Sequence, residues 1–131
     1  MYETILFDLD DTLIDFQASQ MRSLKRLHAE FYTGIDYALF EGVYLPINRA
    51  LWDRVGSDEN PVTPNEIKTI RFIELHKRLN INGGDPRLIS ETYEHFLGET
   101  ADWFPNVKCV IELLHQKGHR LGIITNGLQA L

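Results

Sequence analysis

Two short apolar runs lie near the two ends of the chain, and the residues between them have helical spacing. Residues 5–13 read Ile-Leu-Phe-Asp-Leu-Asp-Asp-Thr-Leu, an apolar run that stops in a carboxylate cluster. Residues 120–125 form a second apolar run, followed by Asn-Gly. Runs that are apolar on both faces are typical of buried parallel strands. The pattern therefore predicts two buried parallel strands.

Helical spacing fills the middle of the chain. Apolar periodicity, together with cap, proline and glycine signals, predicts helices over residues 16–31, 37–55, 63–79, 85–97 and 105–118. Thr63, Pro64 and Glu66 combine an N-cap, a first-turn proline and a capping-box acid. Gly42 and Pro46 predict that the second helix is broken or kinked.

The order of these elements predicts an α/β fold with an insertion. Residues 1–15 and 102–131 would form a parallel core, which is incomplete with only two strands. Residues 16–101 would form one all-helical module inserted between those strands. A chain of 131 residues with 44% hydrophobic residues is long enough for one ordinary domain.

Charge and cysteine content limit the partners and the compartment. A formal charge of −6 disfavours a polynucleotide or an anionic membrane as partner, although a small phosphate can still bind to local donors. The lone Cys109 excludes an internal disulfide and favours a reducing compartment; we expect it to be a small core residue on a helix. No apolar run reaches membrane-spanning length, and no signal-peptide pattern precedes the first strand. We therefore expect a cytoplasmic protein.

Two acids at the end of the first strand are the strongest candidates for chemistry. Asp8 and Asp10 are one residue apart, so on an extended segment their side chains leave the same face. Carboxylates in this position are costly unless a metal or a ligand uses them. The alternative is a simple Asp-Asp-Thr turn. The apolar run before the pair and Thr12 after it favour an active site.

The residues from Asp8 to Thr12 resemble the first motif of the haloacid dehalogenase-like (HAD) hydrolase superfamily, a hydrophobic strand followed by Asp-x-Asp-x-Thr. The run ending at Thr125 resembles the second motif, a strand that ends in Thr or Ser. The resemblance spans the whole chain. It implies a partial Rossmann-like core whose helical insertion, residues 16–101, is a cap over the active site.

The chemistry of these residues suits phosphoryl transfer. An ionised Asp8 can attack phosphorus and form a phospho-aspartyl intermediate, while Asp10 acts as general acid and base. Mg²⁺ is the natural cation for a carboxylate and a phosphate oxygen, and the resemblance implies that it binds the Asp8 carboxylate and the Asp10 backbone carbonyl. Thr125, Asn126 and Gly127 are expected to hold the phosphate, since a turn that opens a helix binds anions. The alternative for these three residues is a simple turn.

Asp10 also distinguishes the branches of the superfamily. The dehalogenase branch displaces halide without a proton and usually lacks this second acid, so a phosphatase is favoured over a 2-haloacid dehalogenase. Ile-Ile-Thr-Asn-Gly-Leu-Gln and the spacing of the cap resemble bacterial pyrimidine 5′-nucleotidases. The expected substrate is therefore a small phosphate monoester, a nucleoside 5′-monophosphate.

One departure from the superfamily pattern leaves a second interpretation open. The third motif has a Lys and the fourth has acids that complete the metal site, and no Lys follows Thr125 in this sequence. We expect the chain to be the N-terminal portion of such an enzyme and to be inactive alone. The alternative is a non-catalytic product whose helical cap serves as an interaction module.

The remaining polar and aromatic candidates have ordinary interpretations. The five histidines have no metal-ligand spacing, and each is expected on a helix surface: His28, His76, His95, His115 and His119. Trp52 and Trp103 are expected to pack in the core or the cap, with base stacking by one of them as the alternative. Asp11 and Asp15 are expected to be solvated or capping residues.

Overall fold

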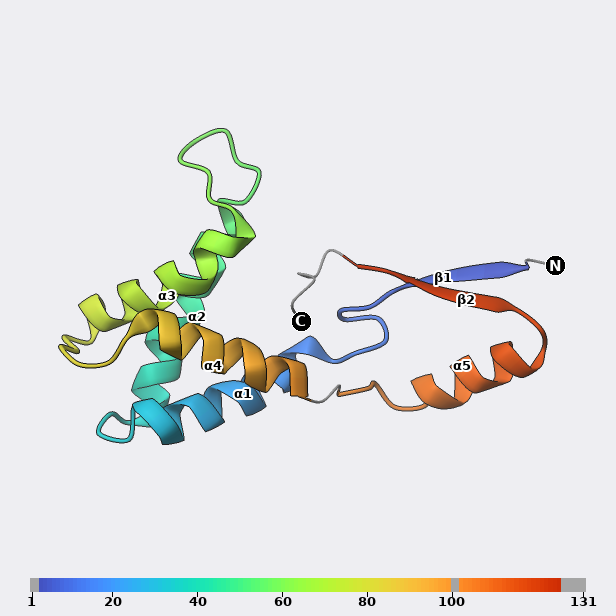
Figure 1. Ribbon diagram of the computed structural model, residues 1–131, viewed down its shortest axis with the longest axis horizontal. Helices are drawn as coiled ribbons and strands as arrows, with labels where there is room; N and C mark the ends of the chain where they lie inside the picture. The colour runs from blue at the N-terminus through green and yellow to red at the C-terminus, as the bar shows by residue number, and fades with distance from the viewer. Residues whose placement is uncertain (1–2, 100–101, 126–131) are drawn as a thin grey trace. The chain divides into compact units, whose positions relative to one another are not determined.

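The structure, a computed structural model, describes residues 3–99 and 102–125 and divides into two compact units (Figure 1). The strand unit comprises Met1–Arg22 and Leu97–Leu131, and the helical unit comprises Ser23–Phe96. The described residues form two parallel strands and five helices, so the predicted α/β class is confirmed.

The strand unit is built on the two predicted strands. β1 (Thr4–Asp8) pairs in parallel with β2 (Arg120–Ile124), and the register places Asp8 opposite Ile124. Helix α5 (Val107–Gln116) precedes β2 and packs against it (Figure 1). The parallel pairing expected from the two apolar runs is therefore confirmed.

The expected burial of these strands is wrong for the described residues. Leu6, Ile123 and Ile124 are 57%, 54% and 61% exposed. Cys109, which we expected in the core, is also exposed on α5. A two-stranded sheet with one helix against it cannot cover both of its faces. Apolar spacing identifies the face that can be buried, but it does not supply the element that covers it.

The helical unit contains α2 (Tyr37–Asp53), α3 (Pro64–Arg78) and most of α1 (Phe16–Phe31) and α4 (Pro86–Glu99). The predicted capping box of α3 is present. The Glu66 N–H donates to Thr63 Oγ1 at 3.3 Å, and the Thr63 N–H donates to Glu66 Oε2 at 2.7 Å. These bonds use two backbone donors that the helix cannot satisfy itself.

Helix α2 is continuous through Pro46, so the helix is not broken there, and the kink that was the other expectation stays a prediction. Pro46 removes one helical hydrogen bond, the one to the carbonyl of Gly42. Two side chains that flank the proline, Tyr44 and Ile47, are buried. Burial of this apolar face offsets the lost hydrogen bond and keeps the helix intact.

The core of the helical unit is aromatic and contains a buried ion pair. The Tyr44 ring lies 5.7 Å from the Phe72 ring and 6.0 Å from the Tyr93 ring, as measured between centroids. Arg71 donates to Glu94 Oε1 at 2.7 Å, and its guanidinium lies 4.7 Å from the Tyr93 ring centroid. The aromatic rings and Glu94 compensate the charge of Arg71, which is 5% exposed.

His76 and the two tryptophans differ from expectation. His76 is buried on α3, and its Nε2 shares a hydrogen bond of 2.8 Å with the Tyr32 hydroxyl, so the surface prediction is wrong for this histidine. Trp52 and Trp103 are 43% and 37% exposed, so neither is a core residue. The helical period alone could not predict whether His76 is buried, because this residue lies at the edge of the apolar face that carries Phe72 and Leu75.

Burial of His76 predicts that the helical unit loses stability in mild acid. Desolvation lowers the pKa of His76 in the folded protein, whereas the unfolded chain has the ordinary value of about 6.5. As the pH falls below that value, the unfolded chain binds the proton more tightly, and stability declines until the pH passes below the folded pKa. The urea midpoint followed by circular dichroism should therefore be lower at pH 5.5 than at pH 7.5.

His76→Gln should make that difference smaller, because glutamine keeps a polar partner for Tyr32 but does not titrate in this range. His95→Gln is the matched control, since His95 is exposed on the neighbouring helix α4. An unchanged pH difference in His76→Gln would assign the acid sensitivity to other groups.

The helices give no indication of a membrane span. Within residues 3–99 and 102–125, none of them is both long and apolar enough to cross a bilayer.

Candidate active site at the strand ends

Asp8 is the last residue of β1, and its carboxylate is exposed. The Thr12 hydroxyl donates a hydrogen bond of 3.2 Å to Asp8 Oδ2. Thr12 thus occupies one carboxylate oxygen and restricts the rotation of the side chain. The other oxygen, Oδ1, does not accept this hydrogen bond from Thr12.

The loop after Asp8 turns back sharply. The Leu9 carbonyl oxygen accepts hydrogen bonds from the N–H groups of Leu13 (3.0 Å) and Ile14 (3.1 Å). Asp11 has a left-handed backbone with φ of 61°, and its N–H donates to the Ile14 carbonyl at 2.8 Å. An aspartate tolerates this conformation better than most residues. Asp10 is exposed in this loop and is separated from Asp8 by Leu9.

Two other aspartates, Asp8 and Asp11, influence the ionisation of Asp10. Burial, then the charges of Asp11 and Asp8, raise the pKa of the Asp10 carboxyl. The charges of Asp11 and Asp8 thus add to burial in disfavouring the ionised form of Asp10.

The second motif reaches the same end of the sheet. Asp8 pairs with Ile124, so Thr125 follows β2 at the end of the sheet where Leu9 follows β1. Thr125 is exposed. The other two predicted phosphate-binding residues, Asn126 and Gly127, lie outside the described residues. The register therefore brings three predicted residues, Asp8, Asp10 and Thr125, to the carboxyl end of the strands, the usual location of ligand sites in parallel sheets.

The donors at this strand end suit a hard cation. The Asp8 carboxylate and the Asp10 backbone carbonyl are oxygen donors, and Mg²⁺ commonly binds through one or two protein carboxylates while it keeps several waters. In the part of the chain that the structure describes, no group of three or more His, Cys, Asp or Glu side chains is arranged to hold a metal. Within those residues, Asp8 and Asp10 could thus supply only some of the ligands that a Mg²⁺ ion needs.

Two features of this site had no clear signal in the sequence. Thr12 is part of the motif, but its spacing alone does not predict that its hydroxyl binds Asp8. The segment that follows the loop pairs with a distant segment through a bridge between Ile14 and Trp103. That pairing joins residues 89 positions apart (103 minus 14), and no local pattern can predict it. The expected capping role of Asp15 is confirmed, because its Oδ1 accepts from the Ala18 N–H at 3.1 Å.

Comparisons with known proteins give consistent results. The family model of haloacid dehalogenase-like hydrolases matches residues 2–131. The pyrimidine 5′-nucleotidase PynA of Streptococcus pneumoniae is 27% identical over 131 residues, which are 99% of this chain and 53% of PynA. The HAD-hydrolase YfnB of Bacillus subtilis is 32% identical over 127 residues, which are 97% of this chain and 52% of YfnB.

A solved structure is similar as well. The crystal structure of YfnB bound to magnesium, which reveals interdomain movement in that protein, matches with a TM-score of 0.79. The match covers 97% of this chain and 54% of that one, at 32% identity. The chain spans about half the length of the curated relatives it matches.

Proposed function

This chain belongs to the haloacid dehalogenase-like hydrolase family, and from that premise we propose that the complete gene product is a Mg²⁺-dependent phosphatase. Its substrates would be small phosphate monoesters, nucleoside 5′-monophosphates in particular. One observation carries the proposal: two interacting carboxylates, Asp8 and Asp10, at the carboxyl end of β1, the second with a raised pKa. This arrangement separates a nucleophile from a proton donor, the two groups that phosphate ester hydrolysis needs.

Asp8 is the proposed nucleophile. Its exposed carboxylate attacks phosphorus, the bond between phosphorus and the ester oxygen breaks, and an aspartyl phosphate forms. The hydrogen bond from Thr12 fixes the orientation of the attacking group before the substrate arrives. Water then attacks the aspartyl phosphate, which releases inorganic phosphate and restores the carboxylate.

Asp10 is the proposed acid and base. In its protonated form it donates to the departing alkoxide, which neutralises the charge that develops on the leaving oxygen. The same carboxylate, now ionised, takes a proton from the hydrolytic water. Burial, together with the neighbouring charges of Asp11 and Asp8, favours the protonated form of Asp10 for the next cycle.

The remaining charge of the phosphate needs partners beyond this pair. Mg²⁺ would be held by the Asp8 carboxylate and the Asp10 backbone carbonyl, and when bound it would neutralise phosphate oxygens. Thr125, at the same strand end, would donate its hydroxyl to a phosphate oxygen, and we extend this role to Asn126 and Gly127. Magnesium in the YfnB structure supports the choice of cation.

The substrate class rests on similarity. PynA is a pyrimidine 5′-nucleotidase, and this chain is similar to it over 99% of its own length. The helical unit would act as the cap that distinguishes one phosphate ester from another. Asp10 supports phosphate over halide chemistry, because a halide leaves without a proton and gains nothing from an acid.

A comparison of phosphate and halide release tests this proposal. The purified complete gene product should release phosphate from dUMP and from an aryl phosphate in the presence of Mg²⁺, and lose this activity with a chelator. Halide release from a 2-haloacid, measured in parallel, should be negligible. Halide release that resists chelation, without phosphate release, would reverse the assignment.

A further inference from the structure

We call the loop that follows Asp8, residues 9–12, the catalytic loop. The segment after this loop pairs with the segment that follows the helical unit. The Asp15 N–H donates to the Asp102 carbonyl oxygen at 2.6 Å, and the Phe104 N–H donates to the Leu13 carbonyl oxygen at 3.1 Å. An antiparallel bridge lies between these two bonds. We call this short pairing of residues 13–15 with 102–104 the connector ladder.

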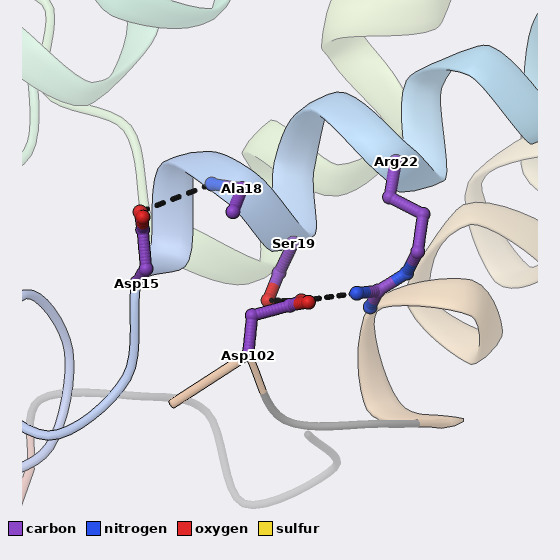
Figure 2. A network of polar contacts seen from close by, with 5 residues as sticks. All are labelled: Asp15, Ala18, Ser19, Arg22 and Asp102. Atoms are coloured by element: carbon purple, nitrogen blue, oxygen red, sulfur yellow. Dashed lines mark hydrogen bonds and ion pairs between the residues drawn. The ribbon is translucent and has the colours of Figure 1, made fainter. Parts of the chain in front are cut away.

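The carboxylate of Asp102 ties this ladder to the first two turns of α1. Figure 2 shows it between Ser19 and Arg22: Ser19 Oγ donates to Asp102 Oδ2 at 2.5 Å, and Arg22 forms an ion pair with the same oxygen. The hydrogen bond from Ser19, and then the charge and hydrogen bond of Arg22, lower the pKa of Asp102, so it stays ionised near neutral pH. At the start of α1, Asp15 caps the Ala18 N–H, so both connector segments are fixed to one helix end (Figure 2).

The connector ladder is also continuous with the catalytic loop. The Ile14 N–H donates to the Leu9 carbonyl at 3.1 Å, and the Ile14 carbonyl accepts from the Asp11 N–H at 2.8 Å. Ile14 forms one isolated bridge with Asp10 and another with Trp103. A shift of the ladder therefore moves the backbone that holds Asp10.

We propose that Asp102 is a positioning residue for the phosphatase reaction proposed above. Its carboxylate holds the connector ladder against α1, and the ladder in turn holds the loop that keeps Asp10 beside Asp8. Asp102 itself touches no reacting atom. Among the described residues, two backbone hydrogen bonds join the two sides of this ladder, so the charged contacts to Ser19 and Arg22 are an appreciable part of what keeps it closed.

Amide hydrogen exchange of the 131-residue chain tests the structural half of this inference. Asp102→Asn removes the charge of the carboxylate, so the amides of Asp15, Phe104, Asp11 and Ile14 should lose protection by about tenfold. Amides in β1 and in the helical unit should keep theirs. Ser19→Ala retains the ion pair and should show a smaller loss at the same four amides. Asp58→Asn, at an exposed loop position of the helical unit, is the control.

Other exchange patterns would overturn the inference. Loss confined to α1, or no loss, would mean that the carboxylate does not hold the ladder. A uniform loss in both units would make Asp102 a general stabilising residue. Ser19→Ala provides the same readout if Asp102→Asn does not fold.

Kinetics of the complete gene product test the other half, which depends on the proposed function. Asp102→Asn should lower kcat by about tenfold with little change in KM, because the loop geometry rather than substrate binding is altered. Raised KM with unchanged kcat would overturn the positioning role. Hydrogen exchange needs no substrate, so the two tests are independent. A wild-type protein without phosphatase activity would refute the proposed function, whereas the exchange result would still decide whether Asp102 holds the connector ladder.

Discussion

Asp8→Asn should abolish phosphate release by the complete gene product, with a loss of at least about a thousandfold in kcat. Asparagine has nearly the shape of aspartate and can still accept the hydrogen bond from Thr12. It is a far weaker nucleophile than a carboxylate and cannot form the acyl phosphate. The measurement is steady-state release of phosphate from an aryl phosphate with saturating Mg²⁺.

The Asp10→Asn variant separates the two halves of the reaction. An aryl phosphate has a good leaving group that needs little help from an acid, so Asp8 should still become phosphorylated. The intermediate should then accumulate, because asparagine cannot take the proton from the hydrolytic water. We expect rapid release of one equivalent of the phenol per enzyme, with no further turnover. Asp58→Asn, at an exposed loop position, is the control. Full activity in Asp8→Asn would refute the assignment of Asp8 as the nucleophile.

The second large effect concerns the chain as given: residues 1–131 alone should show no measurable phosphatase activity. A bound phosphate would lie beside the carboxylates of Asp8 and Asp10, and the negative charges would repel one another. The described residues provide no third His, Cys, Asp or Glu side chain that completes a metal site with them. Electrostatic stabilisation of the phosphate charge commonly dominates phosphoryl transfer, so a site that cannot hold a cation firmly should have no measurable activity.

The assay uses the purified chain with Mg²⁺ and an aryl phosphate, after circular dichroism has verified its helical content. The same chain carrying Asp8→Asn gives the background. Asp8-dependent turnover close to that of the complete gene product would show that the described strand end is sufficient for catalysis.

Local patterns predicted much of the fold because the relevant interactions are local. The capping box at Thr63 and Glu66 lies within four residues and is present as expected. The two apolar runs predicted strands over residues 5–8 and 120–125, and each observed strand differs by one residue, at the start of β1 and at the end of β2. In the candidate site, the positions of Asp8 and Thr125 followed from strand ends alone, once the strands were paired in parallel.

The errors come from interactions that sequence spacing does not encode. Cys109 lies on an amphipathic helix, and its exposure depends on whether another element covers that face. His76 is buried because Tyr32, 44 residues away, supplies a hydrogen-bond partner. The contacts of Asp102 with Ser19 and Arg22 join positions 83 and 80 residues apart. The errors for Cys109 and His76 therefore depend on tertiary contacts rather than on local preferences, and the contacts of Asp102 could not be predicted for the same reason.

The register of the sheet has a consequence for the order of folding. Thr4 pairs with Arg120, so the first contact between β1 and β2 closes a loop of 116 residues (120 minus 4). Closing so long a loop in an unfolded chain is entropically costly, whereas the contacts between the helices of Ser23–Phe96 span shorter separations. Once those helices have packed, the flexible length between the strands is much reduced. We therefore expect the helical unit to assemble before the sheet, and the strand end that carries Asp8 to form late.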